Sequence, residues 1–327
     1  MSGFILFLVS LLSLGAIYAI LCLALNLESG VGGLWDLGIA SFFGIGAYSY
    51  VLVTAGPAAA YQHYLLGLGL PIWIGILAAM AMACLCAALI GALTLKLKRE
   101  YFLITTLAFS EVIRQVYANE DWLTNGVAGI YGLAQPLRGW VAPELYPYLL
   151  LALILAGLAL VALLVTHLSQ APFGRTLRAL RENEALAVTA GIDPRRFHLR
   201  AYVIAGMLSA VAGVFYVWYN TIVNSAQFGN DITFFVWTAL IIGGIGRTRG
   251  ALLGGFIFVL LHDLLRFVSV SGEMAATLSS LRTVAIGAVL ILILRFRPNG
   301  LIPERPLTLA PSGMATVSPS SMVSRHV

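Results

Sequence analysis

The chain has 327 residues, of which 60% are hydrophobic and only 10% are charged. A soluble globular protein is about 45–50% apolar and about 25% charged, so this chain lacks the polar surface that a soluble fold needs. The formal net charge of +5 does not indicate nucleic-acid binding, because the basic residues occur in clusters between long apolar segments. The composition therefore predicts a membrane protein.

Apolar segments long enough to cross a bilayer follow one another along most of the chain. A spanning helix needs about 20 mostly apolar residues. In chain order, the predicted spans cover residues 4–27, 32–54, 65–95, 101–118, 145–166, 200–223, 232–268 and 281–296. A glycine- and arginine-containing run at 246–250 interrupts the seventh of these segments. Its first part, 232–246, is either a short span or a re-entrant helix covered by protein.

The distribution of charge predicts how the spans are oriented. Lys and Arg mark cytoplasmic loops. The first basic residue is Lys96, and further basic clusters occur at 175–200, 247–249 and 295–297, with acidic residues between them. Placing each basic cluster in the cytoplasm gives an outside N-terminus, a cytoplasmic C-terminus and about nine crossings (about eight to ten).

These patterns predict an all-α, polytopic bundle of transmembrane helices in residues 1–302. The remaining residues, 303–327, are rich in Pro, Ser, Thr and small side chains. A segment of that composition cannot bury enough apolar surface to fold, so we expect a disordered cytoplasmic tail.

A basic loop at residues 170–200 is much longer than a connection between two helices requires. Pro172 suits the first turn of a helix, Gly191 suits its end, and Asp193 followed by proline starts the next helix. Between them the sequence predicts one helix over residues 173–189. Its apolar residues recur at helical spacing and form a narrow stripe, which consists of Phe173, Leu177, Leu180 and Val188.

Three interpretations of this helix remain open from the residues. It lies on the anionic membrane surface, it is a solvated connector, or it docks into a groove of a soluble cytoplasmic subunit. Acidic residues among the arginines favour the protein groove over anionic lipid. The candidate docking residues are Phe173, Arg175, Leu177, Arg178, Leu180, Arg181, Glu182, Glu184 and Gly191.

A charged pair within the fourth predicted span is a second candidate site. Glu111 lies about ten residues into that span, and Arg114 follows at i+3 on the same helix face. Charged groups at membrane depth are costly and are rarely incidental. The pair is either a structural ion pair or part of a translocation pathway. The other candidate pathway residues are Asp36, near the cytoplasmic end of the second span, and Gly44 and Gly46 within it.

No catalytic or metal site is predicted. The chain contains no G-x-x-x-x-G-K-[ST] phosphate loop, no H-E-x-x-H pattern and no G-x-S-x-G pattern. Its three cysteines, Cys22, Cys84 and Cys86, lie in apolar runs without metal-ligand spacing. We therefore expect a chain that is not an enzyme, binds no cofactor and hydrolyses no ATP itself.

Six segments along the chain form a recognisable series. They are 38–48 (GIASFFGIGAY), 101–114 (YFLITTLAFSEVIR), 124–130 (TNGVAGI), 173–193 (FGRTLRALRENEALAVTAGID), 241–254 (with IIGGIG and GALLG) and 297–301 (RPNGL). In matching order over residues 5–302, these segments resemble the permease subunits of branched-chain amino acid ABC importers, in particular the LivM type. Two departures are Arg247 and Arg249 in the late glycine motif, where bulky neutral residues are expected.

The resemblance implies a permease subunit in a bacterial inner membrane that works by alternating access. Its implied partners are a homologous LivH-type permease in a heterodimer, two cytoplasmic ATPase subunits that hydrolyse ATP, an extracytoplasmic substrate-binding protein and membrane lipid. The implied cargo is a branched-chain or other neutral amino acid. Amides or urea, which sibling permeases carry, stay open as cargo, and an ATPase-independent secondary transporter stays open as a class.

Overall fold

The computed structural model describes residues 2–58, 62–264 and 300–302, with single helical positions between 284 and 295. Within these residues the fold is all-α, apart from two short strands that pair with each other. The predicted last span, 281–296, and the predicted tail, 303–327, lie almost entirely outside the described residues.

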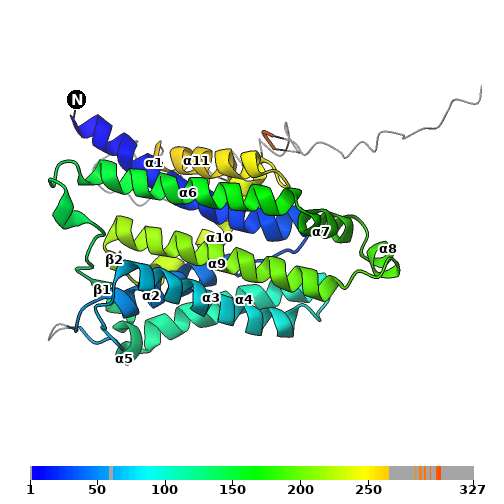
Figure 1. Ribbon diagram of the computed structural model, residues 1–327, viewed down its shortest axis with the longest axis horizontal. Helices are drawn as coiled ribbons and strands as arrows, with labels where there is room; N and C mark the ends of the chain where they lie inside the picture. Colours follow the sequence, from blue (N-terminus) through cyan, green and yellow to red (C-terminus); the bar gives the residue numbers. More distant parts are fainter. Residues whose placement is uncertain are drawn as a thin grey trace, which may run out of the picture.

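Four helices of the described chain are long and apolar enough to cross a bilayer. They are α1 (Ser2–Leu25), α3 (Ile72–Thr94), α6 (Tyr146–Gln170) and α9 (Pro194–Asn220). The shorter α2 (Ile39–Thr54), α10 (Asn230–Gly243) and α11 (Thr248–Leu264), and the more polar α4 (Arg99–Asn119), complete the bundle. All of them run roughly along the long axis of the molecule (Figure 1).

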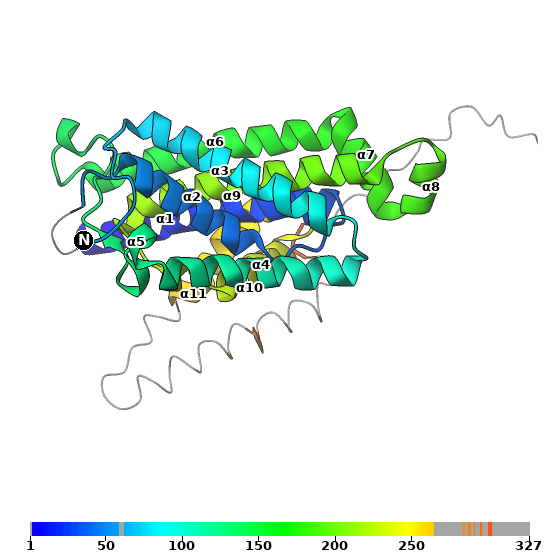
Figure 2. The ribbon, with the colours of Figure 1, turned by 90° about the horizontal axis from the view of Figure 1, so that it is seen from below.

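The two ends of the bundle differ. One end carries the N-terminus, α5 (Asp121–Thr124), and the strands β1 (Ile130–Tyr131) and β2 (Ile222–Val223), and we call it the strand end (Figures 1 and 2). The other carries α7 (Pro172–Glu182), α8 (Glu184–Thr189) and the basic residues around Lys96 and Arg195, and we call it the basic end. This separation is what the alternation of basic and acidic loops predicts.

The short elements of the strand end connect loops that are distant in sequence. β1 and β2 pair antiparallel, with Ile130 opposite Val223 and Tyr131 opposite Ile222. The 3-10 turns η2 (Gly126–Ala128), η3 (Arg138–Trp140) and η4 (Ser225–Phe228) flank the strands. The pairing ties the α4–α6 connection to the α9–α10 connection.

Helix α1 lies in the middle of the bundle. It is apolar on every side, and every residue from Ala16 to Leu25 is buried. A helix that is hydrophobic all round belongs inside a bundle rather than at its surface. Helices α6, α9 and α11 pack around it.

Helix α3 packs through small residues at every fourth position. Its buried stripe consists of Gly75, Ala79, Ala83, Ala87 and Gly91. Small residues let helix backbones approach closely in a membrane. Bulky side chains of the neighbouring helices fill the space at both ends of the stripe: Tyr50 of α2 lies against Gly75, and Tyr202 of α9 lies against Gly91.

Two predicted boundaries need correction. The second span begins at Ile39 rather than 32, because residues 26–31 form a π-helix, η1 (Asn26–Val31), and residues 32–38 form a non-helical connection. The third begins at Ile72 rather than 65, since Pro71 precedes the helix and residues 66, 67 and 69 have positive φ. The predicted interruption near 246 is confirmed, with α10 ending at Gly243 and α11 starting at Thr248.

Candidate functional site

The predicted basic helix over 173–189 is two helices, which corrects the single helix expected from the sequence. The break is at Asn183, whose backbone is extended (φ −155°, ψ 97°). Its side-chain Oδ1 accepts a hydrogen bond from Leu186 N at 3.0 Å and so caps α8. The predicted stop at Gly191 is confirmed by its φ of +83°. Asp193 caps α9 as predicted, because its Oδ1 accepts from Arg195 N at 3.1 Å.

The apolar stripe of α7 is already occupied within this chain, which corrects its expected role as a docking surface. Leu177 is 0% exposed and Leu180 is 3% exposed. Leu177 packs with Val31 and Ala201, and Phe173 and Phe197 complete this small cluster. The stripe therefore anchors α7 to its own bundle. The apolar side chains that remain outside are on α8, where Leu186 is 67% exposed and Val188 is 50% exposed.

The charged residues of α7 and α8 divide between the bundle and the outer surface. Arg181 Nη1 donates to the carbonyl oxygen of Gly30, at the end of η1, and its Nη2 donates to Glu182 at 2.8 Å. Arg175, Glu182 and Glu184 are exposed. The outer face of α7 and α8 is therefore charged, with two apolar side chains at its far end.

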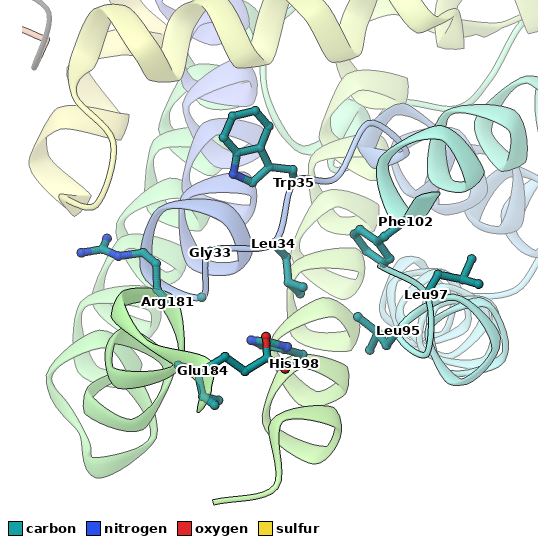
Figure 3. Close-up of a pocket in the computed structure, with 11 residues that line it drawn as sticks. Gly33, Leu34, Trp35, Leu95, Leu97, Phe102, Arg181, Glu184 and His198 are labelled. Carbon is teal, nitrogen blue, oxygen red and sulfur yellow. The ribbon is translucent and has the colours of Figure 1, made fainter. Parts of the chain in front are cut away.

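A cavity of about 280 Å³ lies beneath α7 and α8 (Figure 3). The connection after η1, the α3–α4 connection and the start of α9 form its walls. Glu184 and His198 point toward one another across it, and Leu34 and Phe102 supply apolar walls. The cavity therefore lies between α7 and α8 on one side and the α3–α4 connection on the other.

The predicted pair on α4 is present and belongs to a larger polar group. Arg114 Nε donates to Glu111 Oε2 at 2.9 Å, and Arg114 Nη2 donates to Glu111 Oε1. Gln115 Nε2 donates to Glu111 Oε1 at 2.9 Å, and Asn230 Nδ2 donates to Glu111 Oε2 at 3.3 Å. The sequence analysis missed Gln115, although its i+4 spacing to Glu111 was visible. Asn230 carries no local signal, because it comes from a distant helix.

The α4 group is accessible from outside the chain. The side chain of Glu111 is 39% exposed and that of Arg114 is 28% exposed. Helix α4 buries only a narrow stripe, which consists of Phe102, Thr106, Ser110 and Tyr117. It lies on the opposite side of the bundle from α6 (Figures 1 and 2). A charged, accessible group in the middle of a helix of this length must face water or another protein, since lipid cannot solvate it.

The short helix α10 begins beside this group, inside the bundle. Its first residue, Asn230, contacts Glu111 near the middle of α4. The preceding turn η4 enters the bundle, where Phe228 is buried and packs against Tyr48 and Phe43. The N-terminus of α10, with its free N–H groups, therefore lies at the same depth as Glu111 and Arg114.

The other candidate pathway residues lie elsewhere. A Cβ atom on Gly46 would lie 2.3 Å from the backbone of Ala210, and one on Gly44 would lie 3.1 Å from Phe228. Both glycines are therefore packing contacts between helices of this chain. Asp36 is fully buried and accepts from Gly38 N at 2.8 Å, just before α2 begins. Only Glu111 and Arg114 of the five predicted pathway residues come together on an accessible surface.

One buried carboxyl group was missed from the sequence. Glu28, in η1, is 1% exposed, and its Oε1 has no hydrogen-bond partner among the described residues. Glu28 directly follows the first predicted span, residues 4–27. With Asp36, it places two buried carboxyl groups in the segment that joins α1 to α2.

A bundle of apolar helices long enough to span a bilayer, with a polar group partway along one of them, is the architecture of a polytopic membrane protein. Residues 7–294 match the family described as branched-chain amino acid transport system, permease component. The chain belongs to this family and is a multi-pass membrane protein.

Relatives along most of the chain carry the same description. A probable branched-chain amino acid transport permease protein LivM from Methanocaldococcus jannaschii is 30% identical over 325 residues, covering 90% of this chain and 93% of that protein. The LivM protein of a high-affinity branched-chain amino acid transport system in Escherichia coli K12 is 28% identical, covering 94% of this chain and 73% of its own length. The probable LivH permease of M. jannaschii is 30% identical over 169 residues, covering 49% of this chain and 47% of that protein. No solved structure matches the chain.

Proposed function

We propose that this chain is one of two permease subunits of an ATP-driven importer of branched-chain or other neutral amino acids. The names of its LivM relatives support the cargo. The partial match to LivH proteins supports a homologous second permease as its partner. In this assembly, two ATPase subunits on the cytoplasmic side hydrolyse ATP, and an extracytoplasmic binding protein delivers the amino acid.

The observation that carries this proposal is the surface of α7 and α8. Helix α7 is fixed to the bundle through Leu177 and Leu180, while α8 projects from the basic end and exposes Leu186 and Val188 beside charged side chains. A membrane-surface helix would direct its apolar stripe to lipid. Here the α7 stripe points inward, and the outward face offers a partner protein both charges and two apolar contacts.

The proposed topology follows from the charge separation. The basic end faces the cytoplasm, the strand end and the N-terminus face outside, and the spans number about nine in a bacterial inner membrane. Residues 1–302 form the permease domain, and residues 303–327 form a cytoplasmic tail.

The proposed translocation path runs along the accessible face of α4. Glu111 and Arg114 together add no net charge, and Asn230 and the N-terminus of α10 lie beside them. A neutral amino acid carries one ammonium and one carboxylate group. Glu111 is suited to the ammonium group, and Arg114 with the positive N-terminus of α10 is suited to the carboxylate group. Broken helices that end at mid-depth mark binding sites in other transporters.

The docking surface is tested with the paired substitution Leu186→Asp and Val188→Asp. Coexpressed with its permease and ATPase partners, the wild-type chain should retain the ATPase through purification. The paired variant should retain at most about a tenth as much ATPase, since docking would bury two aspartates without partners. Val127→Asp is the matched control, because Val127 is 74% exposed at the strand end. Equal ATPase recovery from both variants would contradict the assignment of this surface.

The cargo and the energy source are tested in proteoliposomes that contain the complete transporter and its binding protein. Uptake of labelled leucine, isoleucine or valine should require ATP on the side of α7 and α8. Stronger competition by amides or urea than by leucine would show that the cargo is an amide or urea rather than a branched-chain amino acid. Uptake by this chain without any ATPase would show that it is a secondary transporter and not a subunit of an ATP-driven importer.

A further inference from the structure

The segment between α1 and α2, residues 26–38, has an unusual backbone and is buried along most of its length. Its first part is the π-helix η1, and all six residues of η1 are buried. π-helical turns are rare in proteins and are common at functional sites. The second part, 32–38, has no helical structure and leads directly into α2. We call residues 26–38 the junction.

Helix α7 rests directly on the junction. Gly33 has φ +74°, and a Cβ atom there would lie 2.7 Å from Arg181 Cγ and 3.2 Å from Arg181 Cα. Arg181 also donates to the carbonyl oxygen of Gly30, and Leu177 packs against Val31. The backbone of α7 and the backbone of the junction are therefore in contact, with no side chain of Gly33 between them.

The same junction is bonded to both helices of the proposed path. Leu37 N donates to Thr106 Oγ1 on α4 at 3.0 Å. Trp237 Nε1 on α10 donates to the carbonyl oxygen of Asp36 at 2.8 Å. Thr106 precedes Glu111 by five residues, about 7.5 Å along α4. A displacement of the junction therefore acts on the two helices that hold Glu111 and Asn230 together.

A third bond fixes the start of the junction to the α10–α11 turn. Asn26 Oδ1 accepts from Gly246 N at 2.8 Å. Gly30 is packed against this bond, because a Cβ atom on Gly30 would lie 2.2 Å from Asn26 Oδ1 and 2.7 Å from Gly246 N. The junction is therefore hydrogen-bonded to α7, α4, α10 and the α10–α11 turn.

We infer that the junction transmits movement of α7 to α4 and α10, and that Asn26, Gly33 and Arg181 are positioning residues for this coupling. The inference rests on the proposed ABC-importer function. Coupling between distant sites requires a physical connection that both sites bias. The junction supplies one, because a shift of α7 acts on Gly30 through the hydrogen bond from Arg181 and on Gly33 through direct contact. The junction is in turn hydrogen-bonded to Thr106 and Trp237.

The experiment measures amino acid uptake and ATP hydrolysis in the same proteoliposomes of the complete transporter. Three single variants are compared with wild type: Asn26→Leu, Gly33→Ala and Arg181→Met. Each should keep ATP hydrolysis within about twofold of wild type and lower the uptake per ATP roughly tenfold, within the range that coupling residues modulate. A purely structural defect would lower both rates together.

The matched control is Gly132→Ala. Gly132 has φ +75°, the same strained region as Gly33, but a Cβ atom there meets no other atom within 4 Å. It lies on the strand end, away from α7. This variant should retain the wild-type uptake per ATP, so that backbone strain alone does not account for the effect at Gly33.

A double variant tests the contact itself. Arg181→Ala removes the Cγ atom that Gly33→Ala would press against, so the two changes together should cost less than the sum of their separate costs. If Gly33→Ala does not fold, Arg181→Met still tests the contact. We expect Arg181→Met to fold, because the side chain of Arg181 is partly exposed. Wild-type uptake per ATP in Asn26→Leu and Arg181→Met, or additive losses in the double variant, would overturn the inference. Failure of the wild-type chain to bind an ATPase would instead overturn the proposed function.

Discussion

Helices α3 and α4 follow one another in the chain and have similar lengths of 23 and 21 residues, yet their outer faces differ. Each buries one narrow stripe at nearly four-residue spacing. Helix α3 exposes leucines, including Leu77, Leu85 and Leu89, which lipid solvates well. In the same part of its length, helix α4 exposes Glu111, Arg114 and Gln115, which lipid does not solvate, beside the apolar Val112. The comparison teaches that burial alone does not identify the lipid-facing side of a permease subunit, whereas the chemistry of the unburied face does.

The largest expected effect is a loss of protein yield when a charge is placed on the outer face of α3 but not when one is placed on the outer face of α4. Leu85→Arg puts an arginine near the middle of α3, at a cost of about 2.5–3.5 kcal/mol in lipid. Its yield of monodisperse protein extracted from membranes should fall about a hundredfold. Gln115→Arg on α4 is the matched change and should keep most of the yield. Equal yields would mean that both faces meet the same surroundings.

A second test breaks the pair on the accessible face of α4. Glu111→Gln or Arg114→Met leaves one charge without its partner, and each should lower uptake about tenfold. The double variant should lose less than the product of the two single losses, because no unpaired charge remains. The double-mutant cycle is obtained from the uptake rates of the wild type, the two single variants and the double variant, all measured at the same ATP concentration. Multiplicative losses would show that the two side chains act independently.

The smallest expected effect concerns the buried stripe of α4, which has Thr106 and Ser110 in its middle where the middle of the α3 stripe has only alanines. Thr106→Val leaves the Leu37 N–H without its acceptor, at a cost of about 1–3 kcal/mol. Ser110→Ala is the control, because Ser110 Oγ is buried without a partner among the described residues. In thermal unfolding, the midpoint should fall by about 2–4 °C per kcal/mol for Thr106→Val and stay nearly constant for Ser110→Ala. A greater fall for Ser110→Ala would reverse this order.

The sequence was sufficient for features that depend on local pattern. Hydropathy predicted the all-α class and located the helices, and the run of glycines and arginines near 246 predicted the break between α10 and α11. The i, i+3 spacing predicted the contact between Glu111 and Arg114, since helix geometry alone brings such residues together. Gly191 and Asp193 were recognisable as a helix stop and a helix start because glycine and aspartate have strong local preferences for these positions.

Features that depend on tertiary contacts were missed. Asn26 lies in an apolar run that continues the first span, so no local signal separates the π-helix η1 from α1. Leu177 belongs to an amphipathic pattern that fits a partner's groove and the chain's own core equally well, and only the position of Val31 decides between them. Asn183 was different, because an asparagine before a glutamate and an apolar run is a recognisable cap.

The pairing of β1 with β2 has a mechanical consequence for the whole bundle. It joins the strand-end loops that lead into α6 and out of α9, with Gln135 Nε2 also donating to the carbonyl oxygen of Trp218 at 3.3 Å. At the basic end of the described chain, α7 and α8 join the same two helices. Two helices that are held together at one end can move furthest apart at the other end. We therefore expect a change in the angle between α6 and α9 to displace these helices least beside β1 and β2 and most at α7 and α8.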